Sequence, residues 1–124
     1  MKILLAINDR DLLSSLDSIL TIEGFETDTA FDGVQAISLL SRKNFDLAVI
    51  DEYITLLTAK KIAETCKNEF NTKTILLCDK KTGDGFADAE IKYPFVSGEF
   101  ISIIHSLSGR NADIITDDQG EVNL

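Results

Sequence analysis

One short stretch constrains the fold of this chain more than any other: the apolar run from Leu47 to Ile50, which ends abruptly on Asp51. The run lacks the in-and-out alternation of a half-exposed strand, so both faces of this strand should be covered. That pattern is typical of the parallel sheet in an α/β protein. Because ligands bind at the carboxyl ends of the strands in such sheets, Asp51 lies where we expect function.

Two further apolar runs predict buried strands beside the first. Residues 3–7 are followed by Asn8 and Asp9, whereas residues 74–78 end on Cys78. The carboxyl ends of neighbouring parallel strands meet at one edge of a sheet. We therefore expect these polar and thiol side chains to lie near the aspartate that ends the central run.

The segments between the strands carry apolar residues at helical spacing. Helices are predicted over about 11–23, 33–42, 59–70 and 97–108. Asp11 is the expected N-cap of the first helix, and Val34 belongs to the predicted buried stripe of the second. His105 lies off the apolar stripe of the last helix, so we expect it to be solvated.

Two shorter strands complete the predicted sheet. Residues 25–31 alternate between apolar or threonine side chains and charged ones, which predicts a half-exposed edge strand, and residues 89–93 predict a short fifth strand. A helix of about 10 residues with two short loops needs roughly 16 residues. Residues 79–91 must also begin the fifth strand, so we expect a loop there in place of a full helix.

Composition bounds the class of protein. The 124 residues are 44% hydrophobic, which predicts one folded domain over residues 1–108 and an acidic, flexible tail over 109–124. A net charge of −9 argues against direct nucleic-acid binding. No apolar run approaches the roughly 18 residues of a membrane span, so we expect a cytoplasmic protein without membrane contact. Cys66 and Cys78 lack metal-binding spacing and are expected to be reduced thiols.

These features together resemble the receiver domain of two-component response regulators. The resemblance rests on Asn8 and Asp9 after the first strand, Asp51 after the third, the buried 74–78 strand, and the tripeptide 93–95 (YPF), where the family has Lys-Pro-Phe. It implies a flavodoxin-like, five-stranded parallel sheet of order 2-1-3-4-5 with helices on both faces, the fourth helix being shortened or missing here. It also implies a cis peptide bond before the proline.

The resemblance also implies a chemistry. Asp51 corresponds to the aspartate that accepts a phosphoryl group from a histidine kinase or phosphotransfer protein, in a signalling module that is not an enzyme. Mg²⁺ would be held by Asp9, by Asp51 and by the backbone carbonyl of Tyr53. A divalent cation makes physical sense there, because it neutralises the repulsion between a carboxylate and a phosphoryl group.

Several residues at this predicted site depart from the family pattern. Asn8 replaces an acid and so removes one negative charge that would help to hold Mg²⁺. Cys78 replaces a hydroxyl residue, and a thiol is a poor hydrogen-bond donor. Tyr93 replaces the lysine, and its phenol supplies no positive charge. Lys92 would reach the pocket only if the strand were shifted or bulged, because neighbouring strand residues point to opposite faces.

Simpler interpretations stand beside these. Asp51 also fits an ordinary strand-end or capping aspartate, and Asn8 and Asp9 fit capping of the first helix. Cys78 fits a small buried hydrophobic residue better than a redox sensor, and Tyr93 fits core packing with a hydrated hydroxyl.

Three classes of function follow. The first is a receiver that is phosphorylated on its central aspartate and acts on an output protein. The second is a pseudo-receiver that acts as a constitutive protein-interaction module. The third, a flavodoxin-like enzyme that binds a nucleotide or flavin, is disfavoured because no glycine-rich phosphate loop follows the first strand.

Overall fold

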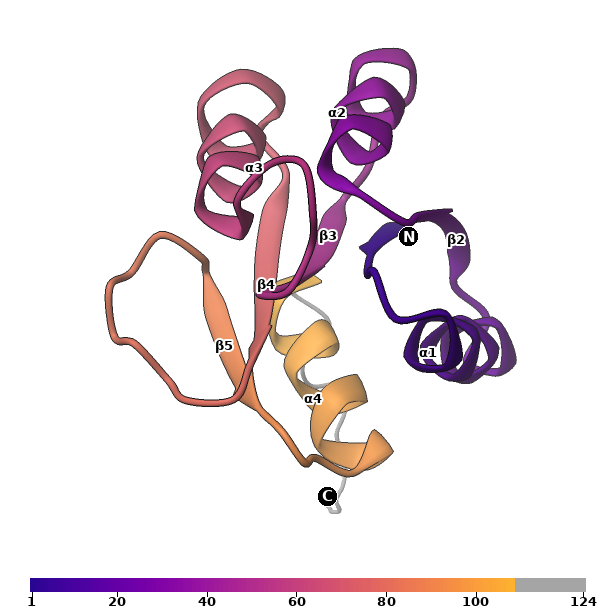
Figure 1. The fold of residues 1–124 in the computed structure, drawn as a ribbon. Coiled ribbons are helices and arrows are strands. Elements are labelled where there is room, and N and C mark those ends of the chain that lie inside the picture. Colours follow the sequence, from indigo (N-terminus) through magenta and orange to yellow (C-terminus); the bar gives the residue numbers. More distant parts are fainter. Residues whose placement is uncertain (109–124) are drawn as a thin grey trace.

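A five-stranded parallel sheet organises the protein (Figure 1). The computed structural model describes residues 1–108. The strands are β1 (Lys2–Ala6), β2 (Glu26–Ala30), β3 (Leu47–Asp51), β4 (Lys73–Cys78) and β5 (Ala89–Lys92). Their order is β2-β1-β3-β4-β5 and every neighbouring pair is parallel, which confirms the predicted topology. All residues of the central strand β3 are buried, as its unbroken apolar run predicts.

Helices cover both faces of this sheet. They are α1 (Arg10–Ile22), α2 (Gly33–Arg42), α3 (Ala59–Thr65) and α4 (Ser97–Ser108), and α3 continues into a π-helical turn, η1 (Cys66–Phe70). One core cluster joins α2 and α3 to the sheet, and a second cluster joins α1 and α4 to its opposite face (Figure 1). The two layers are the arrangement expected when a parallel sheet is buried on both faces.

The connection from β4 to β5 contains no helix, as predicted from its length. Residues 79–88 form a loop whose Phe86 packs against the core cluster under α2 and α3. Two side chains tie this loop to the sheet. Thr82 donates hydrogen bonds to the Glu90 carboxylate through its backbone N–H and its hydroxyl, each at 2.7 Å, and the Asp88 carboxylate accepts one from the backbone N–H of Thr74 at 2.8 Å.

Three local predictions were wrong. Asp9, and not Asp11, caps α1 through its side chain. Val34 is 55% exposed, because α2 turns its small residues Gly33 and Ala36 toward the core. His105 is only partly exposed: its ring lies 5.7 Å from the ring of Phe25, and its Nδ1 atom is buried without a hydrogen-bond partner among the described residues.

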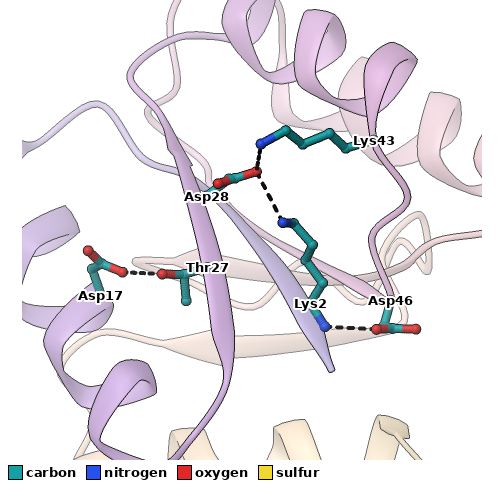
Figure 2. A network of polar contacts seen from close by, with 6 residues as sticks. All are labelled: Lys2, Asp17, Thr27, Asp28, Lys43 and Asp46. Carbon is teal, nitrogen blue, oxygen red and sulfur yellow. Dashed lines mark hydrogen bonds and ion pairs between the residues drawn. The ribbon is translucent and has the colours of Figure 1, made fainter.

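A charged network fixes the sheet toward the amino ends of β1 and β3 (Figure 2). The Asp28 carboxylate on β2 lies 2.8 Å from the ammonium of Lys43 and 3.7 Å from that of Lys2. The hydrogen bond from Lys43 lowers the pKa of Asp28. The backbone N–H of Lys2 also donates to Asp46 at 2.8 Å. These contacts tie the edge strand to its neighbour at the end of the sheet opposite to Asp51.

Some predictions fall outside this description. The acidic, flexible tail was predicted for residues 109–124, which lie beyond the described residues. Within residues 1–108, no helix is both long enough and apolar enough to cross a membrane.

Candidate functional site

The buried carboxylate of Asp51 is the centre of the candidate site. Asp51 ends β3 and is only 3% exposed. Its Oδ1 atom accepts a hydrogen bond from the phenol of Tyr93 at 2.9 Å and one from the backbone N–H of Tyr53 at 3.3 Å. Its Oδ2 atom accepts none from the part of the chain that the structure describes. One oxygen is therefore held in place, and the other is left for a ligand.

Burial raises the pKa of Asp51 above its usual value, although the hydrogen bonds from Tyr93 and Tyr53 act in the opposite direction. The negative charges of Glu52 and Asp9 add to the increase. Burial wins because removing a carboxylate from water costs more than these two hydrogen bonds return. The ionised site would consequently gain from a cation.

Asp51 opens onto a pocket of about 520 Å³ at the carboxyl edge of the sheet. The pocket is lined by Asn8, Asp9, Leu12, Asp51, Tyr53 and Tyr93. Five of the predicted site residues thus come together from the ends of three strands. The lining contains two carboxylates and no basic side chain.

Asp9 caps helix α1 at this pocket and leaves one of its carboxylate oxygens free. As the N-cap of α1, its Oδ1 atom accepts hydrogen bonds from the backbone N–H groups of Asp11, at 2.9 Å, and Leu12, at 3.1 Å. Its Oδ2 atom has no hydrogen-bond partner among residues 1–108. Capping and a ligand role are therefore compatible, because each can use a different oxygen.

The backbone after β5 brings Tyr93 to the pocket. Its N–H donates to the carbonyl of Cys78 at 2.8 Å and so extends the pairing of β4 with β5 by one residue. The peptide bond from Tyr93 to Pro94 is cis, as the resemblance predicted. Burial, together with the nearby Asp51 charge, raises the pKa of the Tyr93 phenol, which keeps the phenol a hydrogen-bond donor at neutral pH.

The two other predicted pocket residues do not line the pocket. Cys78 is fully buried, and its thiol faces the carbonyl of Ile91 at 3.6 Å. Burial raises the pKa of Cys78, as expected for an inert core thiol. Lys92 is exposed and pairs with Cys78 in an unshifted register. Because β5 has neither the shift nor the bulge that Lys92 would need, its ammonium does not replace the missing lysine.

Two hydrogen bonds beside the pocket were not predicted from the sequence. The phenol of Tyr53 donates a hydrogen bond to the Asp79 carboxylate, and the N–H of Asp79 donates to Glu52 at 2.5 Å. The hydrogen bond to Asp79 raises the pKa of Tyr53 to about 12. These contacts join the loop after β3 to the loop after β4. The only sequence signal was that the two loops follow neighbouring strands.

The oxygen atoms of the pocket fit a hard divalent cation. The Oδ2 atoms of Asp9 and Asp51 accept no hydrogen bond from the described chain, and neither does the backbone carbonyl of Tyr53. Within residues 1–108, no three His, Cys, Asp or Glu side chains gather into a metal-binding group. A cation here would thus depend on two carboxylates, one carbonyl and water, a set that Mg²⁺ accepts.

Comparison with known proteins identifies the fold and the class of domain. No protein-family profile matches the chain. The chain is 30% identical to the probable transcriptional regulator ycf27 of Porphyra purpurea, over 98% of this chain and 53% of that protein. The receiver domain of a Francisella response regulator superposes with a TM-score of 0.80 at 25% identity, over 90% of this chain and 98% of that one.

A third similar protein is the response regulator TrrA of Thermotoga maritima. Its structure, in complex with Mg²⁺-BeF, superposes with a TM-score of 0.78 at 26% identity, over 86% of this chain and 97% of that one. The fold and these relatives define a receiver domain of the response-regulator family. In sequence and fold the chain is similar to such receiver domains of two-component signalling, as its residues predicted. It spans about half the length of the curated relatives that it matches.

Proposed function

We propose that Asp51 accepts a phosphoryl group from a histidine kinase or a phosphotransfer protein and that the domain passes this state to an output protein. The observation that carries the proposal is a buried carboxylate with one oxygen held by two donors and the other left without a donor in a pocket. The free oxygen forms a bond to phosphorus while the bond from phosphorus to the donor breaks. The leaving group of the donor then takes a proton from water.

Magnesium is the cofactor that these residues would hold. Asp9, Asp51 and the carbonyl of Tyr53 would be its ligands, and water would complete the shell. When bound, the ion neutralises the charge of the carboxylates and of the incoming phosphoryl group. The Mg²⁺-BeF complex of the Thermotoga relative supports this assignment. Asn8 contributes no charge, so we expect weaker Mg²⁺ binding than two acids at this strand tip would give.

Phosphorylation is tested by mass spectrometry of the intact protein after incubation with Mg²⁺ and acetyl phosphate. We expect the wild type to gain one phosphate and Asp51→Asn to gain none. Equal modification of both proteins would place the phosphate elsewhere. If neither is modified, and beryllofluoride with Mg²⁺ leaves the NMR signals of the pocket unchanged, the phosphorylation mechanism is wrong.

A second candidate function is a pseudo-receiver, a module that binds its partner in one constitutive conformation. The contact between Tyr93 and Asp51 favours it, because the phenol already occupies one carboxylate oxygen and no lining side chain supplies a positive charge. A partner whose affinity is the same for the wild type and for Asp51→Asn, with or without Mg²⁺, would establish this function. For either function we expect the domain to act in the cytoplasm, without direct binding to nucleic acid or membrane.

A further inference from the structure

A row of aromatic rings leads from the Asp51 carboxylate to helix α4. The phenol of Tyr93 donates to Oδ1 of Asp51 at 2.9 Å. Its ring stacks on Phe95, with centroids 5.8 Å apart and ring planes 29° apart. Phe95 in turn contacts Phe100 of α4, with centroids 5.7 Å apart. Phe100 is fully buried in the core between α4 and the sheet. Tyr93 and Phe95 are half-buried against the core that holds Phe100, so a movement of the phenol toward Phe95 reaches a close-packed neighbour in α4.

The geometry points to Tyr93 as a positioning residue that responds to the charge on Oδ1 of Asp51 and transmits that state through Phe95 and Phe100 to α4. This inference rests on the proposed function, because phosphorylation is the event that changes the charge on Oδ1. The Tyr93 side chain differs in its mechanics from the lysine of the family pattern. A rigid ring packed against other rings couples its hydroxyl to the core, whereas an ammonium on a flexible stem does not.

The chemistry of the carboxylate explains the response. While Asp51 is ionised, both oxygens share the charge, and the hydrogen bond from Tyr93 is charge-assisted. When Oδ2 bonds to phosphorus, Oδ1 becomes a neutral carbonyl oxygen, and a hydrogen bond to it is roughly half as strong. The phosphoryl oxygens then carry the charge. Because a phenol has a single O–H to donate, Tyr93 exchanges its acceptor and its ring moves against Phe95.

The backbone of Tyr93 is held in place, so only its side chain can move. Its N–H is bonded to the carbonyl of Cys78 at 2.8 Å, at the end of the β4 and β5 pairing, and Ile91, two residues earlier, is fully buried. The main chain is therefore tied to the sheet. A change of acceptor is absorbed by rotation of the side chain, whose ring stacks on Phe95.

The test removes the charge by substitution, so it does not depend on phosphorylation. Asp51→Asn keeps an Oδ1 acceptor but makes it neutral. The NMR signals of the Phe100 ring and the Ile104 methyl groups, both buried in α4, are compared in four proteins: wild type, D51N, Y93F and D51N/Y93F. We expect D51N to shift these signals when Tyr93 is present and to shift them less than half as much in the Y93F background.

Two controls separate transmission from general perturbation. Tyr53→Phe removes the other phenol at the pocket, which bonds to Asp79 and not to the Asp51 side chain, so D51N should shift the α4 signals fully in that background. Ile62, buried in α3 on the opposite face of the sheet, should show the same D51N shift with Tyr93 or with Y93F. The inference would be overturned if D51N shifted the α4 signals equally with Tyr93 and with Y93F, or shifted them in neither protein.

A second experiment separates this inference from the proposed function. Mg²⁺ and beryllofluoride are added to the wild type and to Y93F while the amide signals of Asp51 and Tyr53 are followed. If both proteins bind and only the wild type shifts Phe100, the relay operates with a phosphoryl mimic. If neither protein responds at Asp51, the proposed function fails, and the four-protein comparison still decides whether Tyr93 couples the carboxylate to α4.

Discussion

Gly33, the first residue of α2, should not tolerate a methyl group. A Cβ built on it would lie 2.6 Å from Cβ and 3.0 Å from the backbone nitrogen of Leu57. The backbone there is held, because the N–H of Gly33 donates to the carbonyl of Thr55 at 2.8 Å. Overpacking of this kind costs about 1–3 kcal/mol, whereas replacing glycine by alanine in a helix gains at most about 1 kcal/mol. We expect Gly33→Ala to destabilise the fold by about 1–2 kcal/mol.

Urea unfolding followed by far-UV circular dichroism measures this loss: the urea concentration at half-unfolding should fall, while the dependence of the unfolding free energy on urea concentration stays the same. Gly98 provides the matched control: it lies in the first turn of α4, and a Cβ there meets nothing within 4 Å. Gly98→Ala should therefore stabilise the protein by about 0.5 kcal/mol. Because the loop that carries Leu57 also carries Tyr53, Gly33→Ala should in addition shift the Tyr53 amide signal. A Gly33→Ala protein as stable as the wild type would refute the packing argument.

Three further predictions concern charge and reactivity. Burial raises the pKa of Asp51, so its ionisation opposes folding; Asp51→Asn should raise the Tm at pH 7.5, and this gain should shrink as the pH falls through the raised pKa. Burial raises the pKa of Cys66 to about 12 and also raises that of Cys78, so a thiol reagent at pH 8 should label both only after unfolding, and fast labelling of the native protein would contradict this. Asn8→Asp and Tyr93→Lys together should strengthen Mg²⁺-dependent beryllofluoride binding by more than the sum of their single effects, as fluorine NMR can measure; strict additivity would count against coupling.

The strands were predictable because burial on both faces leaves a direct trace in sequence. Uninterrupted apolar runs at 3–7, 47–50 and 74–78 correspond to β1, β3 and β4. The missing helix between β4 and β5 was equally visible, since residue count alone excludes it. These features depend on local composition and length, which a single sequence carries in full.

Helix orientation and caps were less predictable, because they depend on close approach between segments. The exposure of Val34 follows from the contact between Gly33 and the loop after β3, which no periodicity reveals. Asp9 and Asp11 are both acceptable caps, and the turn after β1 decides between them. The helix end at Phe70 agrees with the prediction, but the π-helical turn before it and its cap were not predicted; the cap is Asn71, which has a positive φ of 53° and an N–H bond to the carbonyl of Cys66.

Asp51 and its pocket were predicted from strand ends, but the partners of its carboxylate were not. The resemblance placed Tyr93 at the pocket and left open whether its phenol packs in the core or contacts the site. The structure gives both, because the ring stacks on Phe95 while the hydroxyl reaches Asp51. The hydrogen bond between Tyr53 and Asp79 had no sequence signal beyond strand order, since the two residues are 26 positions apart.

Two departures from the receiver pattern offset one another in formal charge. Asn8 removes a negative charge at the end of β1, and Tyr93 removes a positive charge at the end of β5, so the formal charge of the pocket equals that of the pattern. The phenol replaces the hydrogen bond of the lysine but not its charge, and the pKa of Asp51 accordingly stays raised by burial. An ionised Asp51 would therefore still gain from a cation. The Tyr93 phenol binds the ionised carboxylate more strongly than the neutral carbonyl oxygen of an acyl phosphate, which favours the unmodified state. Whether the domain is switched or constitutive then depends on how strongly a cation from solution binds against that preference.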